Sequence, residues 1–242
     1  MDPNIIFALV GLIIGLAKGG IGGPVVGALT LALLTQIMPV ASAAGFTLPL
    51  LIIGDIFAVS FYWREWDWRL VRLLLPAALV GTLIGAFLLT SLPDDILRKI
   101  LGFLSLAVVV YKIANERLST LEYEARDWHG WVAGFTGGFG SALANVGGPP
   151  ITAYLLLQRM KPANFVGTLA IFFFILNIVK MPIFGAGDIL DIPLLLSIAW
   201  IIPLIPFGVW FGRRIIHWID PRAFDIIMTV LLIWAALSLL FG

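Results

Sequence analysis

Long runs of apolar residues, separated by short stretches that hold most of the charge, dominate the chain. Continuous runs lie near 43–62, 73–91, 96–114, 163–184, 193–211 and 223–241, and two further runs, at 4–38 and 128–159, are interrupted by glycine and proline. A helix needs about 20 apolar residues to cross the roughly 30 Å hydrocarbon core of a bilayer. The pattern therefore predicts an all-α polytopic membrane protein, and the strict alternation typical of transmembrane barrels is not seen in it.

Composition supports the same class. Of the 242 residues, 61% are hydrophobic and only 12% are charged, whereas a soluble domain carries about a quarter charged residues. The net charge of +1 argues against a nucleic-acid partner. The sequence has no cysteine, which excludes disulfides, thiolate metal sites and a cysteine nucleophile. The expected location is the inner or plasma membrane, with the lipid bilayer as the constant partner.

The runs fall into two series, one from 4 to 114 and one from 128 to 241, each of which begins with an interrupted run. The two series match each other in sequence. Gly22, Gly23 and Pro24 correspond to Gly147, Gly148 and Pro149, and Asp55 corresponds to Asn177. Further matched residues follow in the same order: Pro76, Gly81, Gly85 and Pro93 with Pro203, Gly208, Gly212 and Pro221. We therefore expect an internal duplication, with a first repeat at 1–114, a cytoplasmic connector at 115–127 and a second repeat at 128–242.

Lysine and arginine set the expected orientation, because cytoplasmic loops are enriched in both. Eleven of the fifteen basic residues lie in four connectors, near 64–72, 112–126, 159–161 and 213–222. All four connectors reach the cytoplasm only if each interrupted run returns to the side it entered. Each repeat is then a broken helical hairpin, re-entrant or short, plus three transmembrane helices. The repeats have opposite orientation, and both termini are extracytoplasmic. Inverted repeats with broken helices are typical of secondary transporters.

The glycine-rich joints of the hairpins are candidate anion sites. A helix N-terminus presents unpaired backbone N–H groups and partial positive charge, which favour anions. The candidate substrate-binding residues of the joints are Gly19, Gly20, Gly22, Gly23, Pro24, Gly147, Gly148 and Pro149. The alternative is that glycine only permits close helix packing. That alternative is the favoured interpretation for Gly81, Gly85, Gly208 and Gly212.

Few charged residues lie within the runs, and each is costly there unless it meets water or a partner. Lys18 would supply positive charge to an anion site, or else it would snorkel to an interface. Asp55 is the candidate proton-coupling residue, since burial favours the neutral form of a carboxyl group; it is equally suited to be the fixed partner of Lys18 or Lys180. Asn177 and Lys180 share a helical face, and Lys180 is placed either to contact substrate or to snorkel.

Neutral hydrogen-bonding groups lie near the joints at Thr47, Ser141 and Asn145, and each is a further candidate substrate contact. No histidine and carboxylate cluster has the spacing of metal ligands, so no metal or cofactor is expected. No catalytic constellation is recognisable either, so the chain is not expected to be an enzyme. A membrane-anchored interaction protein is disfavoured because the polar connectors are short.

The first hairpin, LIIGLAKGGIGGPVV, with a later TLPL, and its second-half counterpart, GFTGGFGSALANVGGPP followed by FFFILNIVK, resemble the TauE/SafE sulfite exporter family. This family is also called the toluene sulfonate uptake permeases. The likeness covers essentially the whole chain. It implies an inner-membrane permease for small sulfur-containing anions such as sulfite, organosulfonates, sulfoacetate or thiosulfate, coupled to protons. The direction of transport varies within the family.

The sequence thus predicts a secondary transporter with one anion site near the midplane, reached by alternating access as the hairpins rock against the other spans. The alternative is a passive anion channel. The choice of anion, the direction of transport, the coupling ion and the oligomeric state stay open at this point.

Overall fold

The computed structural model describes residues 3–19, 25–118, 126–158, 160–215 and a set of helical residues between 226 and 241. Within these ranges the secondary structure is helical, with no strand. The α-helices are α1 Pro3–Lys18, α2 Val25–Leu34, α3 Val40–Phe61, α4 Trp68–Ser91, α5 Asp94–Leu118, α6 Asp127–Ala144, α7 Gly148–Leu156, α8 Pro162–Ala186, α9 Ile192–Ser197 and α10 Leu204–Ile215.

Within the described residues, three helices are long and apolar enough to cross a membrane: Val40–Phe61, Trp68–Ser91 and Ala163–Ala186. With α5, they correspond to the expected spans near 43–62, 73–91, 96–114 and 163–184. These helices and the apolar composition indicate a multi-pass membrane protein, as predicted. The expected span at 223–241 lies partly outside the described residues.

The continuous span expected near 193–211 is wrong. The segment forms the short helix α9, a 3-10 turn at Ala199–Ile201 and then α10. Pro203 has no N–H group to donate to a carbonyl group of the preceding turn, and α10 begins at the residue after it. Its counterpart Pro76 lies inside the unbroken α4, so the two matched segments differ in structure.

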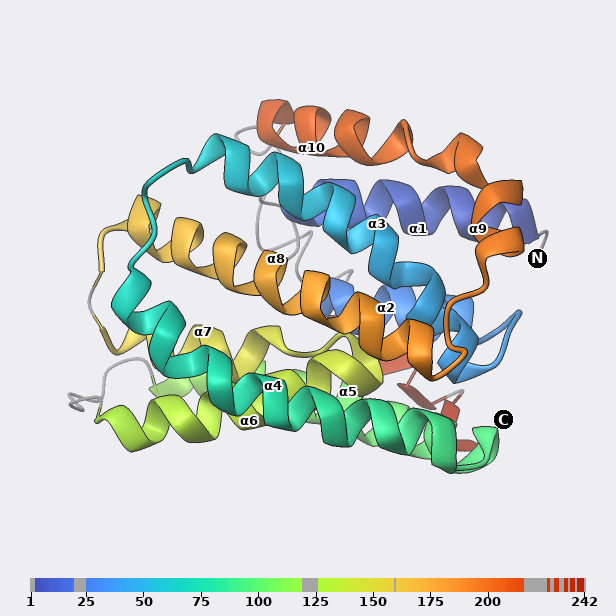
Figure 1. The fold of residues 1–242 in the computed structure, drawn as a ribbon, viewed down its shortest axis with the longest axis horizontal. Helices are drawn as coiled ribbons and strands as arrows, with labels where there is room; N and C mark the ends of the chain where they lie inside the picture. Colours follow the sequence, from blue (N-terminus) through green and yellow to red (C-terminus); the bar gives the residue numbers. More distant parts are fainter. Residues whose placement is uncertain are drawn as a thin grey trace.

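The two interrupted runs form hairpins that open at opposite ends of the molecule (Figure 1). The open end of the α1–α2 hairpin lies against the start of α5, where Val40 N donates to Asp94 Oδ1 at 2.7 Å and the Arg98 guanidinium donates to Thr35 O at 2.7 Å. The open end of the α6–α7 hairpin lies near the α3–α4 connection, and Arg69 and Asp127 form an ion pair of 3.6 Å there. Each hairpin therefore returns to the end it entered, as the charge pattern required.

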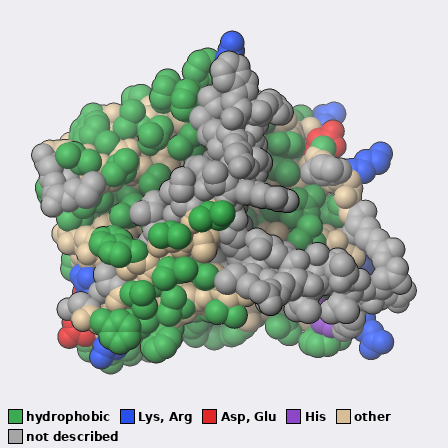
Figure 2. All heavy atoms as spheres, turned by 180° about the vertical axis from the view of Figure 1, so that it is seen from behind, with side chains coloured by type: hydrophobic (Ala, Val, Ile, Leu, Met, Phe, Trp, Pro, Cys, Tyr) green, Lys and Arg blue, Asp and Glu red, His purple; other side chains and the backbone are tan. Residues whose placement is uncertain are grey.

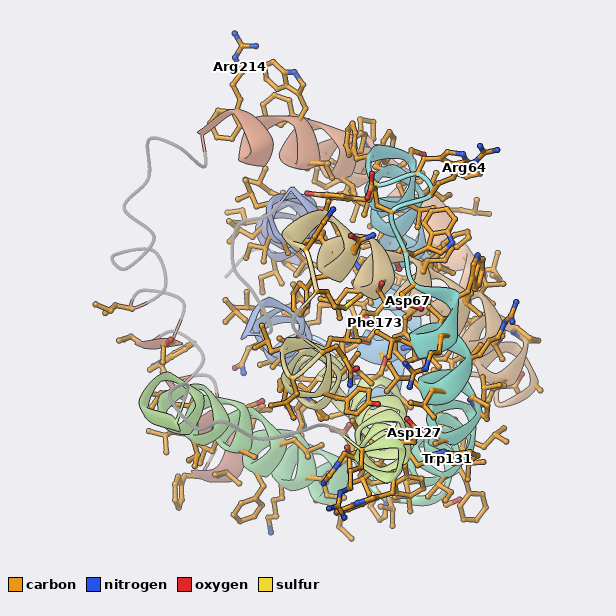
Figure 3. All side chains as sticks on the ribbon, turned by 90° about the vertical axis from the view of Figure 1, so that its left-hand side faces the viewer. Arg64, Asp67, Asp127, Trp131, Phe173 and Arg214 are labelled. Carbon is orange, nitrogen blue, oxygen red and sulfur yellow. The ribbon has the colours of Figure 1, made fainter. Side chains whose placement is uncertain are left out.

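Basic connectors gather at one end, which we call the basic end and define by residues 62–72, 126–129, 158 and 160–168. Asn164 Nδ2 donates to Glu65 O at 2.8 Å and Asp67 N donates to Thr168 Oγ1 at 2.9 Å, which join two of these segments. Figure 3 looks onto this end and shows Arg64, Asp67 and Asp127 on it. In Figure 2, hydrophobic side chains cover much of the visible face and charged side chains lie mainly at its edges.

The first arm of each hairpin packs on a helix of the other half. Helix α1 lies along α10, α6 lies along α4, and α3 and α8 pack together between these pairs (Figure 1). Glycine recurs at every fourth residue on both arms, which lets the backbones approach closely. A Cβ atom at Gly15 would lie 2.9 Å from Gly208 Cα, and one at Gly138 would lie 2.7 Å from Ala78 Cα.

The same contacts test the four glycines that were assigned to packing. Positions Gly81 and Gly85 face α6, and Gly208 and Gly212 face α1. A side chain at Gly81, for example, would meet the backbone of Phe139 at 2.8 Å. The packing interpretation of these four residues is therefore confirmed.

Gly138→Ala is expected to destabilise the protein, because the added methyl group would overlap the backbone of Ala78 and force α6 away from α4. Overpacking of this kind costs about 1–3 kcal/mol. The matched control is Gly185→Ala, also within a helix, where the nearest atom would lie at an ordinary 3.8 Å. Melting temperatures in detergent should fall for the first variant and stay level or rise for the second. Equal melting temperatures would contradict the close α4–α6 contact.

Candidate functional site

The start of α2 meets the joint of the α6–α7 hairpin inside the bundle. Gly27, in the first turn of α2, lies directly against the carbonyl group of Asn145, which ends α6, and any side chain at position 27 would collide with it. Asn145 has φ 52° and ψ 27°, a left-handed conformation that asparagine adopts more readily than most residues. This turn lets the chain reverse from α6 into α7 within three residues. The first turn of α2 is therefore a neighbour of the α6–α7 joint, whereas residues 20–24 of the other joint lie outside the described residues.

A cavity of about 170 Å³ lies among α1, α2, α3, α8 and the α6–α7 joint. Five polar side chains line it: Lys18, Thr30, Ser141, Asn145 and Asn177. Gly148 and the apolar side chains of Ile14, Leu51 and Phe173 contribute to the remaining wall. Figure 3 shows Phe173 in the interior of the bundle, among the ribbons rather than on its outer surface. Irregular backbone at membrane depth is tolerated where it is buried in protein or lines such a cavity.

A chain of polar contacts connects three helices beside this cavity. The Lys18 ammonium, at the end of α1, forms an ion pair with Asp55 Oδ1 on α3. The other oxygen, Asp55 Oδ2, accepts a hydrogen bond of 2.8 Å from Asn177 Nδ2 on α8. The side chain of Asp55 has no exposed surface, whereas that of Lys18 is 21% exposed. Of the two partners considered for Asp55, the structure selects Lys18, and it does not support snorkelling of Lys18.

Lys180 lies one turn along α8 from Asn177 and is fully buried. Its ammonium donates to Ser141 O at 3.0 Å and to Ser141 Oγ at 3.1 Å, and it lies 5.7 Å from the centre of the Phe184 ring. The snorkelling alternative for Lys180 is therefore wrong. Among the described residues, no carboxylate lies within ion-pair distance of it.

The remaining candidates divide into cavity and support positions. Asn145 Nδ2 donates at 2.8 Å to Thr47 Oγ1, which itself donates to its own helix, so Thr47 holds Asn145 in place instead of lining the cavity. Gly19 lies against Val209 and Gly212 of α10, and Gly147 lies against Gly137 O. Pro149 is buried in the first turn of α7. Gly20, Gly22, Gly23 and Pro24 lie outside the described residues.

Several lining residues were not anticipated from sequence. The Thr30 hydroxyl donates to Gly27 O of its own helix at 2.8 Å, a local bond that serine and threonine often make. Phe173 belongs to a run of three phenylalanines that reads only as an apolar span. In neither case does a local pattern distinguish the residue from its neighbours. Over the described part of the chain, no group of three or more histidine, aspartate or glutamate side chains is placed to hold a metal ion.

Comparison with known proteins gives the family of the chain. The family model "Sulfite exporter TauE/SafE" matches residues 6–239. The chain is also 26% identical over 182 residues to the "Probable sulfite/organosulfonate exporter TauE" of Cupriavidus necator, a match that covers 73% of this chain and 69% of that protein. No solved structure matches.

A helical membrane protein with a polar cavity between two broken hairpins, matched in this way, is a membrane transporter and not an enzyme. The chain belongs to the TauE/SafE sulfite exporter family.

Because Asp55 is more deeply buried than Lys18, removing the charge of Lys18 should lower the stability of the protein more than removing the charge of Asp55. Lys18→Met leaves a fully buried carboxylate without its counter-ion, and breaking a buried pair in this way costs on the order of 3 kcal/mol. Asp55→Asn leaves a partly exposed ammonium that water can reach, so its cost is smaller. The double variant carries neither charge and should be no less stable than Asp55→Asn.

Thermal melting of the three variants in detergent checks this order. If Lys18→Met and Asp55→Asn lower the melting temperature equally, and the double variant lowers it by their sum, the two groups do not form a pair.

Proposed function

We propose that this protein is a secondary transporter that carries small sulfur-containing anions together with protons, by alternating access around the cavity between the hairpins. The observation that supports it best is the Lys18–Asp55 ion pair beside that cavity. A lone cation would bind an anion without any proton, and a lone carboxylate would repel it. When the two groups are in contact, binding of the anion is coupled to protonation of the carboxylate.

The coupling follows from electrostatics in a medium of low polarity. While Asp55 is ionised, its charge cancels that of Lys18, and an arriving anion meets little net attraction from the pair. A proton on Asp55 removes the competing charge and leaves the Lys18 ammonium to the anion. Protonation of Asp55 therefore favours binding of the anion, and the bound anion favours protonation of Asp55, since an unpaired buried charge is costly.

Backbone donors near the joints add to Lys18. Gly148 begins α7 and lines the cavity, so its N–H group and the positive end of that helix are available to an anion. The next two residues of α7 are Pro149 and Pro150, which have no N–H group. Lys18 consequently carries more of the proposed binding than α7 does. The polar side chains of Ser141, Asn145 and Asn177 complete the proposed site.

The reciprocal packing supports two inverted repeats, at 1–114 and 128–242, joined through 115–127. Helix α1 packs on α10 as α6 packs on α4, and the hairpins open at opposite ends. Because basic residues favour the cytoplasmic side of the inner membrane, the basic end is placed in the cytoplasm and both termini outside. Each hairpin is then held by the other repeat, so that rocking of one repeat against the other alters access to the cavity.

Family membership supports the substrate class. The Cupriavidus necator relative is described as a sulfite/organosulfonate exporter. The cavity of about 170 Å³ has room for a small anion such as sulfite. Which sulfur-containing anion is bound is decided by a thermal-shift screen with sulfite, thiosulfate, sulfoacetate, taurine and carboxylates.

Asp55→Asn should separate anion movement from proton movement, because asparagine stays neutral and carries no proton across. In proteoliposomes with the membrane potential clamped, a pH difference of one unit should drive about tenfold accumulation by the wild type if one proton accompanies each anion. The variant should still exchange labelled anion across the membrane but accumulate none. The control is Asp188→Asn, which alters an exposed carboxylate on a connector and should behave as the wild type. A wild type that equilibrates the anion but never concentrates it would be a passive anion channel.

Lys18→Ala should abolish or strongly weaken anion binding. Removal of Lys18 alone leaves the Asp55 carboxylate unpaired, which destabilises the protein. The same change is therefore also made in the Asp55→Asn variant, which has no carboxylate at this position. Thermal-shift or calorimetric titration with the anion found in the screen measures the effect. Binding of wild-type strength in the folded double variant would remove Lys18 from the site.

A further inference from the structure

We infer that Lys180 sets the charge of the transported anion, so that the site takes a doubly charged anion together with one proton. This inference rests on the proposed function and deepens it by one property, the valence of the substrate. Lys180 does not line the cavity. Its role is that of a specificity residue acting through Ser141 and through its field.

The contacts of Lys180 are those of an ammonium group held by neutral acceptors. It donates to Ser141 O and Ser141 Oγ and faces the Phe184 ring. Ser141 is in the last turn of α6, where helix carbonyl groups carry partial negative charge. None of these partners carries a full charge. In its ammonium form, Lys180 therefore carries a positive charge that these partners screen but do not cancel.

Ser141 connects Lys180 to the cavity. Its hydroxyl oxygen accepts a hydrogen bond from Lys180, which leaves its single proton free to be donated elsewhere. Because Ser141 also lines the cavity, that proton is available to an anion there. The hydroxyl is in this way polarised by the lysine behind it, and both effects favour negative charge in the cavity.

Counting the charges gives the valence. The sequence places three ionisable groups deep within the apolar runs, namely Lys18, Asp55 and Lys180. With Asp55 protonated, two ammonium groups remain, and a dianion neutralises them. Without Lys180, the same protonated site would be neutralised by a monoanion. Since uncompensated charge within the membrane is costly, the two lysines favour the dianion.

The test compares two probes of similar shape, sulfoacetate with two negative charges and sulfoacetamide with one. Calorimetric titration of the detergent-solubilised wild type should show sulfoacetate binding tighter by roughly tenfold to a hundredfold, as expected for one extra charge at a few ångströms in a poorly screened site. Lys180→Met should abolish or reverse this preference. Lys180→Gln, which keeps N–H donors for Ser141 without the charge, should do the same. The surface control Lys99→Met removes one exposed positive charge and should leave the preference intact.

The melting temperature distinguishes this role from a structural one. A buried charge without a counter-ion is costly to hold, so the Lys180 variants should remain folded while they lose selectivity. Equal affinities of the wild type for both probes, or an unchanged preference in both Lys180 variants, would overturn the inference and leave the proposed function standing. If the wild type binds neither these probes nor the other sulfur-containing anions of the screen, the proposed function fails and the inference fails with it.

Discussion

The cost of holding charge inside a bilayer is the constraint on which the rest of this molecule depends. Three ionisable side chains lie deep in the apolar runs, and the structure gives each one a definite partner: Asp55 pairs with Lys18 and accepts from Asn177, while Lys180 donates to Ser141. These contacts connect α1, α3, α6 and α8, which belong to both halves of the chain. Burying such groups has no advantage for stability alone. Of the three, Lys18 lines the cavity, while Asp55 and Lys180 contact Asn177 and Ser141, which line it.

Glycine packing and the polar cavity have complementary roles in this arrangement. Along α1 and α6, glycine at every fourth position brings each arm into close contact with α10 or α4. At the described ends of these arms, Lys18 and Asn145 bring polar side chains to the cavity. The tightly packed arms thus position these polar residues.

Much of the candidate site was predictable because membrane depth makes polar residues conspicuous. Lys18, Asp55 and Asn177 are recognisable in the sequence as rare polar residues within apolar runs, and the structure brings them together. Thr30 and Phe173 were not predictable, since threonine commonly bonds its own helix and phenylalanine is ordinary in a span. The break at Pro203 was also missed, because Pro76 occupies the matching position of α4 without interrupting it.

By itself, the sequence determined the class of protein, the hairpins, the gathering of basic connectors at one end and the small set of charged residues that need partners. These properties depend on local composition, since hydropathy, helix-breaking residues and charge act wherever they lie along the chain. Only the tertiary structure decided which lysine pairs with Asp55, that Lys180 is buried against Ser141 and not at an interface, and which glycines face a helix of the other half. Such pairings join residues tens of positions apart, and they depend on how the helices are rotated against one another.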